Sequence, residues 1–312
     1  MIPVARISQM RECDRITIEE LGLPGVVLME YASRAVADEA FNMLGGEPEG
    51  KFVRIFCGRG NNGGDGFAVA RHLSNAGMSI DVLLMGKTKE LRGDALFNCK
   101  LYQKLGGQVK EIHSEADLKP SRRQPDLIVD ALLGTGFKGV VEGLYARAIK
   151  LINNSGAPIL AVDIPSGVEG DTGVASGIAV KADSTVTFGL LKPGLVLPPG
   201  RELGGKISVA DIGIASEVVS RQNIDQLIVE KNDVIANLPR LSRADHKGKA
   251  GHVFILAGSP GLTGAAVLAA EASMRTGAGL TVVGVPEQLN PILEMKLTES
   301  MTLPFRQMMA VF

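Results

Sequence analysis

The sequence predicts an α/β protein in which a mainly parallel sheet lies between two layers of helices, as a three-layer αβα sandwich. Short apolar segments of strand length alternate along the chain with longer segments whose apolar residues recur at helical spacing. Glycine-rich turns connect several of these strands to the helices that follow them. This alternation is typical of parallel sheets that are covered by helices on both faces.

Two helices are expected before the first strand. The first follows Ser8, whose hydroxyl suits the N-terminal cap of a helix, and ends near Gly22 and Pro24. The second ends at Gly45-Gly46. Its apolar residues recur at helical spacing, at Leu28, Ala32, Ala35, Val36 and Ala40.

From residue 51 onward, strands alternate with helices. The segment 51–57 (KFVRIFC) predicts a buried strand, and a glycine-rich turn then leads into a helix with Phe67, Ala70 and Leu73 on one face. In such a sheet, ligands bind at the carboxyl ends of the strands, near a switch in strand order. Further strands are expected at 80–85, 126–132, 158–162, 184–188 and 206–209, and further helices at 91–105 and 143–152.

Composition excludes several classes of protein. The apolar fraction of 45% is enough for a sizeable core, and the formal net charge of −1, without a basic block, argues against nucleic acid as a partner. Three scattered cysteines without CxxC spacing indicate reduced thiols and no zinc site. Because no run approaches the ~20 apolar residues of a membrane span, no membrane partner and a cytoplasmic location are expected. The oligomeric state is left open, a homo-oligomer included.

The chain is expected to contain two domains, at 1–215 and 216–312. Residues 215–250 read as a connector that ends in a charged run. A second strand, glycine turn and helix follow at 252–275, and then an apolar strand at 280–285. The residues after it are too few for another complete α/β domain. We therefore expect this segment to expose apolar surface, to pack on the first domain or to stay partly disordered.

The glycine-rich run Gly58–Gly66 is the richest candidate for ligand binding. Its glycines let backbone N–H groups approach a phosphate, and the start of the next helix adds a favourable dipole. It also satisfies G-x-G-x-x-G, the fingerprint of Rossmann-like dinucleotide sites, but Asp81 lies near the beginning of the next strand and not at its end. An ordinary nicotinamide dehydrogenase is therefore disfavoured. The alternative is a tight turn in which Asp65 caps the helix.

Polar residues follow two further strands. A second glycine loop comes after the strand that ends at Asp130, and a third strand ends in Asp163-Ile-Pro-Ser166. Carboxylate, amide and hydroxyl oxygens are hard ligands, so Asn62, Asp130 and Ser166 suit a small hard cation and not zinc. Taken singly, each aspartate could equally be a cap or a surface residue. Three polar strand ends in one sheet argue together for a site.

These segments resemble motifs of a known family, the NAD(P)HX epimerases or YjeF N-terminal domain family. The similarity covers essentially all of residues 1–215, and the tract Phe188–Gly194 looks like a late loop of the same family. Three motifs carry the resemblance in order, namely CGRGNNGGDGFAVARHL, VDALLGTGFKG and AVDIPSGVEGDTG.

The resemblance implies a substrate, a catalytic activity and a cofactor. The substrate would be NADHX or NADPHX, which is NADH or NADPH hydrated at C6 of the nicotinamide ring, and the enzyme, an isomerase, would interconvert its R and S forms. Asn62, Asp130 and Ser166 would hold K⁺. The substrate site would comprise Asn61, Asn62, Gly63, Gly64, Asp65, Gly134, Thr135, Gly136, Phe137, Lys138, Gly139, Val140 and Asp163.

Asp163 is the candidate catalytic acid or base, because it lies at a strand end and matches the third motif. Lys192 is a second candidate, for contact with a phosphate or the ring. We expect it more simply to be an exposed loop lysine.

The segment HKGKAGHVFILAGSPGLTGAAVLAAEASMRTGAGLTVVGVPE resembles the opening of the ADP- or ATP-dependent NAD(P)HX dehydratases, which have a ribokinase-like fold. In many bacterial proteins this domain follows the epimerase on one polypeptide. Because the family's later GTGD-type motif does not occur here, we expect this incomplete segment to have no dehydratase activity. The alternative to an epimerase is a non-catalytic nucleotide-binding or scaffold module of the same fold.

Overall fold

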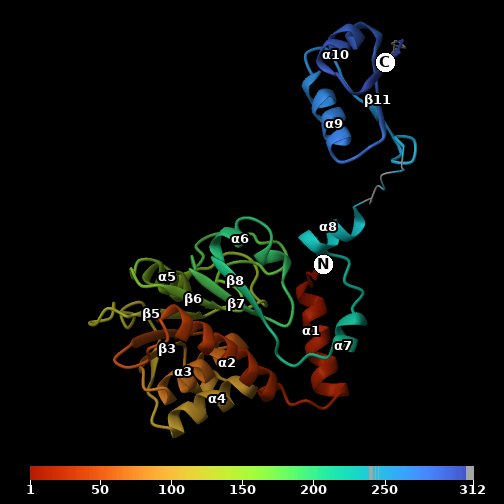
Figure 1. Ribbon diagram of the computed structural model, residues 1–312. Coiled ribbons are helices and arrows are strands. Elements are labelled where there is room, and N and C mark those ends of the chain that lie inside the picture. Colours follow the sequence, from red (N-terminus) through yellow and green to blue (C-terminus); the bar gives the residue numbers. More distant parts are fainter. Residues whose placement is uncertain (239–241, 243, 245, 307–312) are drawn as a thin grey trace. The chain divides into compact units, whose positions relative to one another are not determined.

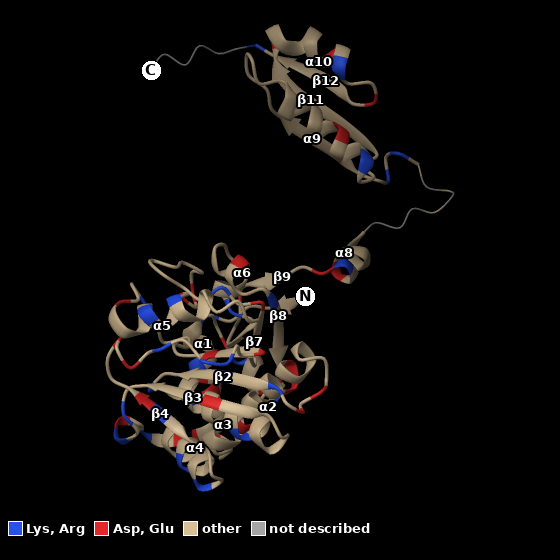
Figure 2. Cartoon of the chain, turned by 90° about the vertical axis from the view of Figure 1, so that its left-hand side faces the viewer, with Lys and Arg blue, Asp and Glu red and all other residues tan. Residues whose placement is uncertain are grey.

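The computed structural model describes residues 1–238, 242, 244 and 246–306. The chain divides into two compact units, of which the first is Met1–Val229 and the second begins at Glu230. Acidic and basic residues are interspersed along the helices and strands of both units (Figure 2). No helix among the described residues is long and apolar enough to cross a membrane.

The first unit is built on a seven-stranded sheet in which all neighbouring strands are parallel (Figure 1). The order β4-β3-β2-β5-β6-β7-β8 reverses the direction of chain progression between β2 and β5. Each of the six expected strands is present, with ends within one residue of the expected position, and the sheet also contains β4, which was not expected. The strands are β2 (Phe52–Cys57), β3 (Ser79–Met85), β4 (Val109–Ile112), β5 (Leu127–Ala131), β6 (Ile159–Val162), β7 (Ser184–Phe188) and β8 (Lys206–Ala210).

Helices cover both faces of this sheet, which confirms the Rossmann-like αβα sandwich. One core lies between the sheet and α2, α3 and α4, and a second lies between the opposite face and α5. Strand β2 contributes to both, because Val53 and Ile55 face the first core and Phe56 faces the second. The helices are α2 (Gly25–Met43), α3 (Asn61–Asn75), α4 (Gly93–Lys104), α5 (Gly143–Asn153) and the short α6 (Gly200–Leu203).

The N-terminal helix α1 (Ile7–Arg15) begins one residue before Ser8, so the expected cap is wrong. Its first backbone N–H, that of Ile7, donates to Asp171 Oδ1 at 2.7 Å. A distant side chain therefore satisfies the helix start that a local hydroxyl was expected to satisfy. The helix continues into a π-helical turn (Ile16–Glu20).

The first unit extends beyond residue 215. Strand β9 (Leu227–Ile228) pairs antiparallel with β1 (Ile2–Pro3), and α7 (Ser216–Ser220) buries Val218 against Cys13 and Ile16 of the N-terminal segment. Residues 216–229 thus pack on the first unit, and this part of the expected connector is structured. The next helix is α8 (Lys231–Asn237).

The second unit contains a three-stranded parallel sheet, in the order β10-β11-β12. Its small core lies between this sheet and the helices. As expected, it exposes apolar surface, since Phe254 is 55% and Leu256 74% exposed. The elements are β10 (His252–Leu256), α9 (Gly264–Arg275), β11 (Leu280–Pro286), α10 (Asn290–Lys296) and β12 (Met301–Phe305).

Candidate functional site

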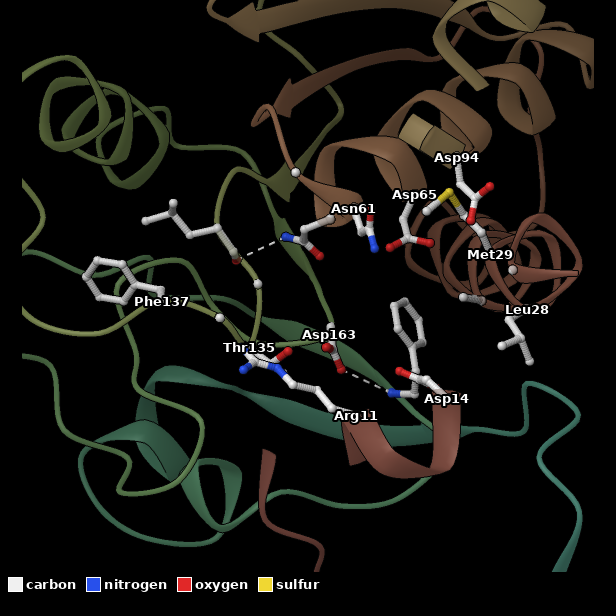
Figure 3. Close-up of a pocket in the computed structure, with 18 of the residues that line it drawn as sticks. Arg11, Asp14, Leu28, Met29, Asn61, Asp65, Asp94, Thr135, Phe137 and Asp163 are labelled. Atoms are coloured by element: carbon white, nitrogen blue, oxygen red, sulfur yellow. Dashed lines mark hydrogen bonds between the residues drawn. The ribbon is translucent and has the colours of Figure 1, made fainter. Parts of the chain in front are cut away.

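A cavity of about 650 Å³ lies at the carboxyl ends of β2, β5, β6 and β7 (Figure 3). It is at the switch in strand order between β2 and β5, where parallel sheets of this kind bind ligands. Its wall includes residues from all three expected motifs, among them Asn61, Gly134 and Asp163.

The glycine-rich run after β2 is mostly helix and not loop, because α3 already begins at Asn61. Gly63 and Gly64 are buried packing positions within it. A Cβ on Gly63 would collide with the carbonyl oxygen of Gly58, and one on Gly64 with the backbone of Ala95. Tight packing therefore fixes the N-terminus of α3 at the cavity, where its dipole favours an anionic group.

Asp65 is the fifth residue of α3 and lines the cavity, so the alternative in which it caps the helix is wrong. Its side chain is buried. Burial raises the pKa of this carboxyl well above its usual range, and the charges of Asp163, Asp14 and Asp94 raise it further. A protonated Asp65 can donate a hydrogen bond to a ligand.

The three residues expected to bind a cation lie together, and one of them, Asn62, lines the cavity. Ser166 Oγ donates to Asp130 Oδ1 at 2.6 Å and accepts from Leu133 N at 2.9 Å. Asn62 Nδ2 donates to Leu133 O at 3.0 Å. Asp130, Ser166 and Asn62 are 0%, 1% and 9% exposed. Leu133 thus connects the side chains of Asn62 and Ser166, and Ser166 in turn connects to Asp130.

This cluster is rich in oxygen atoms. Burial raises the pKa of Asp130 to about 6, although its hydrogen bonds from Ser166 oppose the shift. A positive charge nearby would relieve the cost of burying the carboxylate. Because Asn62 uses its Nδ2 on Leu133, its Oδ1 is left for a ligand. These hard donors fit a small cation such as K⁺.

Asp163 is held in place by a buried lysine. Its Oδ1 accepts from Lys192 Nζ at 2.6 Å, from Thr187 Oγ1 at 2.9 Å and from Phe188 N at 3.2 Å. Among the described residues, no hydrogen bond goes to Oδ2. The backbone of Asp163 has φ of +66°, which is uncommon for a residue with a side chain. The carboxylate is thus positioned at the cavity wall with one oxygen available.

Lys192 is 2% exposed, so the expectation of an exposed loop lysine is wrong. Its ammonium group also donates to Thr187 Oγ1 and to Phe188 O, both at 2.8 Å. An ammonium group tolerates this burial because all of its partners are oxygen atoms and one of them is a carboxylate.

The other residues expected at the site divide into two groups. Asn61, Asn62, Asp65, Gly134, Thr135, Gly136, Phe137 and Asp163 line the cavity. Gly63, Gly64, Lys138, Gly139 and Val140 do not. Of these, Gly139 N donates to Glu169 Oε1 at 2.9 Å, and Val140 is exposed. Their contact with substrate stays a prediction.

Comparison with known proteins agrees with this geometry. The sequence profile of the family described as YjeF-related protein N-terminus matches residues 25–194. The chain belongs to this family. The crystal structure of yeast ynu0 superposes with a TM-score of 0.60 at 22% identity, over 74% of this chain and 98% of that one, which is a likeness of fold.

Two curated relatives of the chain are longer than it is. The bifunctional NAD(P)H-hydrate repair enzyme Nnr of Moorella thermoacetica is 43% identical over 299 residues, and that of Thermofilum pendens is 38% identical over 299 residues. Each alignment covers 95% of this chain and 56% of the relative. The chain thus spans little more than half the length of these relatives.

Sequence reasoning missed the residues that α1 brings to the cavity, which precede the part matched by the family profile. Arg11 and Asp14 both line the cavity, and Figure 3 shows them on α1 beside Thr135 and Asp163. Arg11 lies close to the glycine loop: one of its guanidinium nitrogens is 3.4 Å from the point that a Cβ atom would occupy if Gly136 had a side chain. Burial raises the pKa of Asp14 to about 6. No local motif marks either residue, because each is one charged residue on an amphipathic helix.

Proposed function

We propose that this protein is an NAD(P)H-hydrate epimerase, an isomerase that interconverts the R and S forms of NADHX and NADPHX. One observation carries the proposal. The Asp163 carboxylate is fixed at the cavity wall by the buried Lys192, with Oδ2 left for a substrate. Membership of the YjeF-related family and similarity to proteins named NAD(P)H-hydrate repair enzymes support it.

The chemistry suits a fixed carboxyl group. In the hydrated ring, the C6 hydroxyl lies beside the ring nitrogen, whose lone pair stabilises the cation that forms when the hydroxyl leaves. Water can then add to the other face of the ring. A group that moves a proton to the leaving oxygen or from the attacking water typically accelerates such a step about 10²–10⁴-fold. Asp163 is our candidate for such a group.

The cavity also suits a dinucleotide. Its volume of about 650 Å³ is in the usual range for small-molecule sites. The N-terminus of α3 and the glycine loop at Gly134–Gly136 offer backbone N–H groups to a diphosphate. Arg11 adds a cation next to that loop.

Asn62, Asp130 and Ser166 would hold a K⁺ ion. When bound, the ion would supply a positive charge that offsets the buried carboxylate. Asn62 and Ser166 also form hydrogen bonds with Leu133, at the start of the glycine loop, and Asp130 accepts one from Leu132 N, so the same residues hold the loop beside the cavity.

The test is conversion of a mixture of R- and S-NADHX in the presence of an added ATP-dependent dehydratase that accepts only the S form. With an epimerase present, both forms end as NADH. We expect full conversion by this chain and, in Asp163→Asn, a fall of about 10²–10⁴-fold in kcat with substrate affinity retained. Running each assay with K⁺ and with a large organic cation shows whether the ion is needed.

A non-catalytic binding module would leave the R form unconverted while still binding NADHX. That result would contradict the proposal. Full epimerase turnover in Asp163→Asn would leave the activity standing and remove the role of Asp163.

A further inference from the structure

We propose that Asp14, on α1, is the general acid that works together with the Asp163 carboxylate during epimerisation. This inference rests on the proposed function. It adds to the site a helix that lies before the residues matched by the family profile.

Helix α1 has a cavity face and a core face. Arg11 and Asp14 are three residues apart, which puts them on the same side of a helix, and both line the cavity. Cys13 is buried against Ile16 and Val218. Glu12 is directed to Arg15, which donates to it at 2.7 Å. The cavity face therefore presents one cation and one carboxyl group.

Asp14 lies in a field of several charged groups. Asp163 and Lys192 act on it from the ends of β6 and β7, and Asp65 on α3 interacts with both Asp14 and Asp163. Arg11 lines the same cavity from the same helix. The net effect raises the pKa of Asp14 to about 6. Burial is the largest cause, the charge of Lys192 opposes it, and the charge of Asp163 adds to it.

The two carboxyl groups therefore differ in environment. Asp163 is paired with the ammonium group of Lys192 at 2.6 Å, whereas Asp14 is half-buried without an ion pair among the described residues. Carboxyl groups whose environments separate them in this way commonly serve as an acid and a base. A pKa near the working pH is also what a general acid needs.

The proton balance is complete without any co-reactant. The C6–O bond breaks, its electron pair stays on oxygen, and Asp14 gives that oxygen a proton, so that water leaves. A second water forms a new C6–O bond on the opposite face and gives a proton to Asp163. Exchange with solvent returns a proton to Asp14 and removes one from Asp163, or the reverse reaction uses them with the roles exchanged.

Asp65 is the rival acid, because it lines the cavity and burial raises its pKa well above the usual range. The variants distinguish the two residues. If Asp14 is the acid, the decline in kcat with rising pH should disappear in Asp14→Asn and persist in Asp65→Asn.

The experiment measures kcat and KM for R-NADHX from pH 5 to 8 in the full chain and in Asp14→Asn, Asp14→Glu, Asp65→Asn and Glu12→Gln. Glu12→Gln is the matched control, because it removes a carboxylate from the same helix outside the cavity. We expect wild-type kcat to fall as pH rises through about 6, as Asp14 loses its proton. Asp14→Asn should lower kcat about 10²–10⁴-fold, leave KM nearly unchanged and abolish that decline. Asp14→Glu should restore part of the lost kcat and part of its decline with rising pH.

Two results would overturn the inference while leaving the epimerase intact. In the first, Asp14→Asn has the same kcat and the same pH dependence of kcat as the wild-type chain. In the second, Asp14→Asn and Glu12→Gln lose the same factor in kcat, which would indicate damage to helix α1. Circular dichroism and melting temperature of each variant report on folding. No epimerisation by the wild-type chain would instead reject the proposed function itself.

Discussion

At the scale of single residues, the site depends on charges that are buried with a partner. Lys192 and Asp163 are joined at 2.6 Å, with side chains 2% and 14% exposed. Removing one partner of such a pair leaves the other charge without compensation, and this costs more than the pair contributes. The pair therefore links the stability of the fold to the position of the catalytic candidate.

This linkage leads to a prediction about Lys192. Lys192→Met should lower the free energy of unfolding by roughly 3–5 kcal/mol, because the Asp163 charge is left buried without its ammonium partner. Arg221→Met is the control: Arg221 also pairs with a carboxylate, Glu217 at 2.6 Å, but the two side chains are 50% and 75% exposed. Solvent screens the charge that is left, so the free energy of unfolding should hardly change. Urea unfolding measures both. Equal losses in the two variants would contradict the role of the buried pair.

At the scale of elements, helix α3 reaches the cavity only because glycines let it approach β2 and α4 closely. Gly63 in its first turn contacts the backbone at Gly58, while Gly60, at the helix cap, has open space on its Cβ side. The same residue type thus has a packing role at one position and none at the other.

Gly63→Ala and Gly60→Ala should therefore differ sharply in stability. At Gly63 the added methyl group meets backbone that cannot move independently of β2, and we expect a loss of about 1–3 kcal/mol or more. At Gly60, whose φ of −90° suits any residue, the melting temperature should hardly change. Thermal melts of both variants test this; similar melting temperatures would show that α3 can shift without cost.

The expected cation site also belongs to this scale, because it joins α3, the end of β5 and the segment after β6. We predict that K⁺ raises the melting temperature relative to choline at equal ionic strength. A ligand at one hundred times its Kd stabilises the fold by about 2.7 kcal/mol.

Asp130→Asn should remove this effect of K⁺. Asp126→Asn should keep it, since Asp126 lies just before the other end of β5, where it accepts a hydrogen bond from Phe52 N. If K⁺ and choline give equal melting temperatures in the wild-type protein, the site does not bind K⁺.

At the scale of the whole molecule, the two units differ in how well they bury their strands. Every residue of β2 is buried, whereas four of the five residues of β10 are exposed. Both are strands of parallel sheets, so the difference reflects the neighbours available to each and not the type of strand.

Hydrogen exchange should report this difference. Local opening is easiest where few apolar contacts are lost, so we expect the amides of β10 to exchange at least about 100-fold faster than those of β2. The central strand of the second unit, β11, is the internal control and should lie between them. Mass spectrometry of peptides from each strand gives the comparison. Equal protection of β10 and β2 would mean that the exposed face is covered in solution.

Much of this molecule could be predicted from local patterns. Runs such as FVRIFC, apolar except for Arg54, indicate a parallel strand that is buried on both faces, and apolar segments of strand length located six of the seven strands of the large sheet. The exception, β4, is a short edge strand with the sequence VKEI, whose side chains are only partly buried. Motif residues at strand ends could be assigned to one edge of the sheet for the same reason, since parallel strands bring their carboxyl ends together.

The sequence by itself determined the order of strands and helices, the family and the strand ends that meet at the cavity, because these depend on periodicity and on short motifs. Only the tertiary structure decided that Lys192 is buried against Asp163, that Asp171 caps α1 and that Asp14 lines the cavity. Each of these contacts joins residues from separate segments of the chain. Their energies depend on burial and on the charges nearby, and neither is a property of the local sequence.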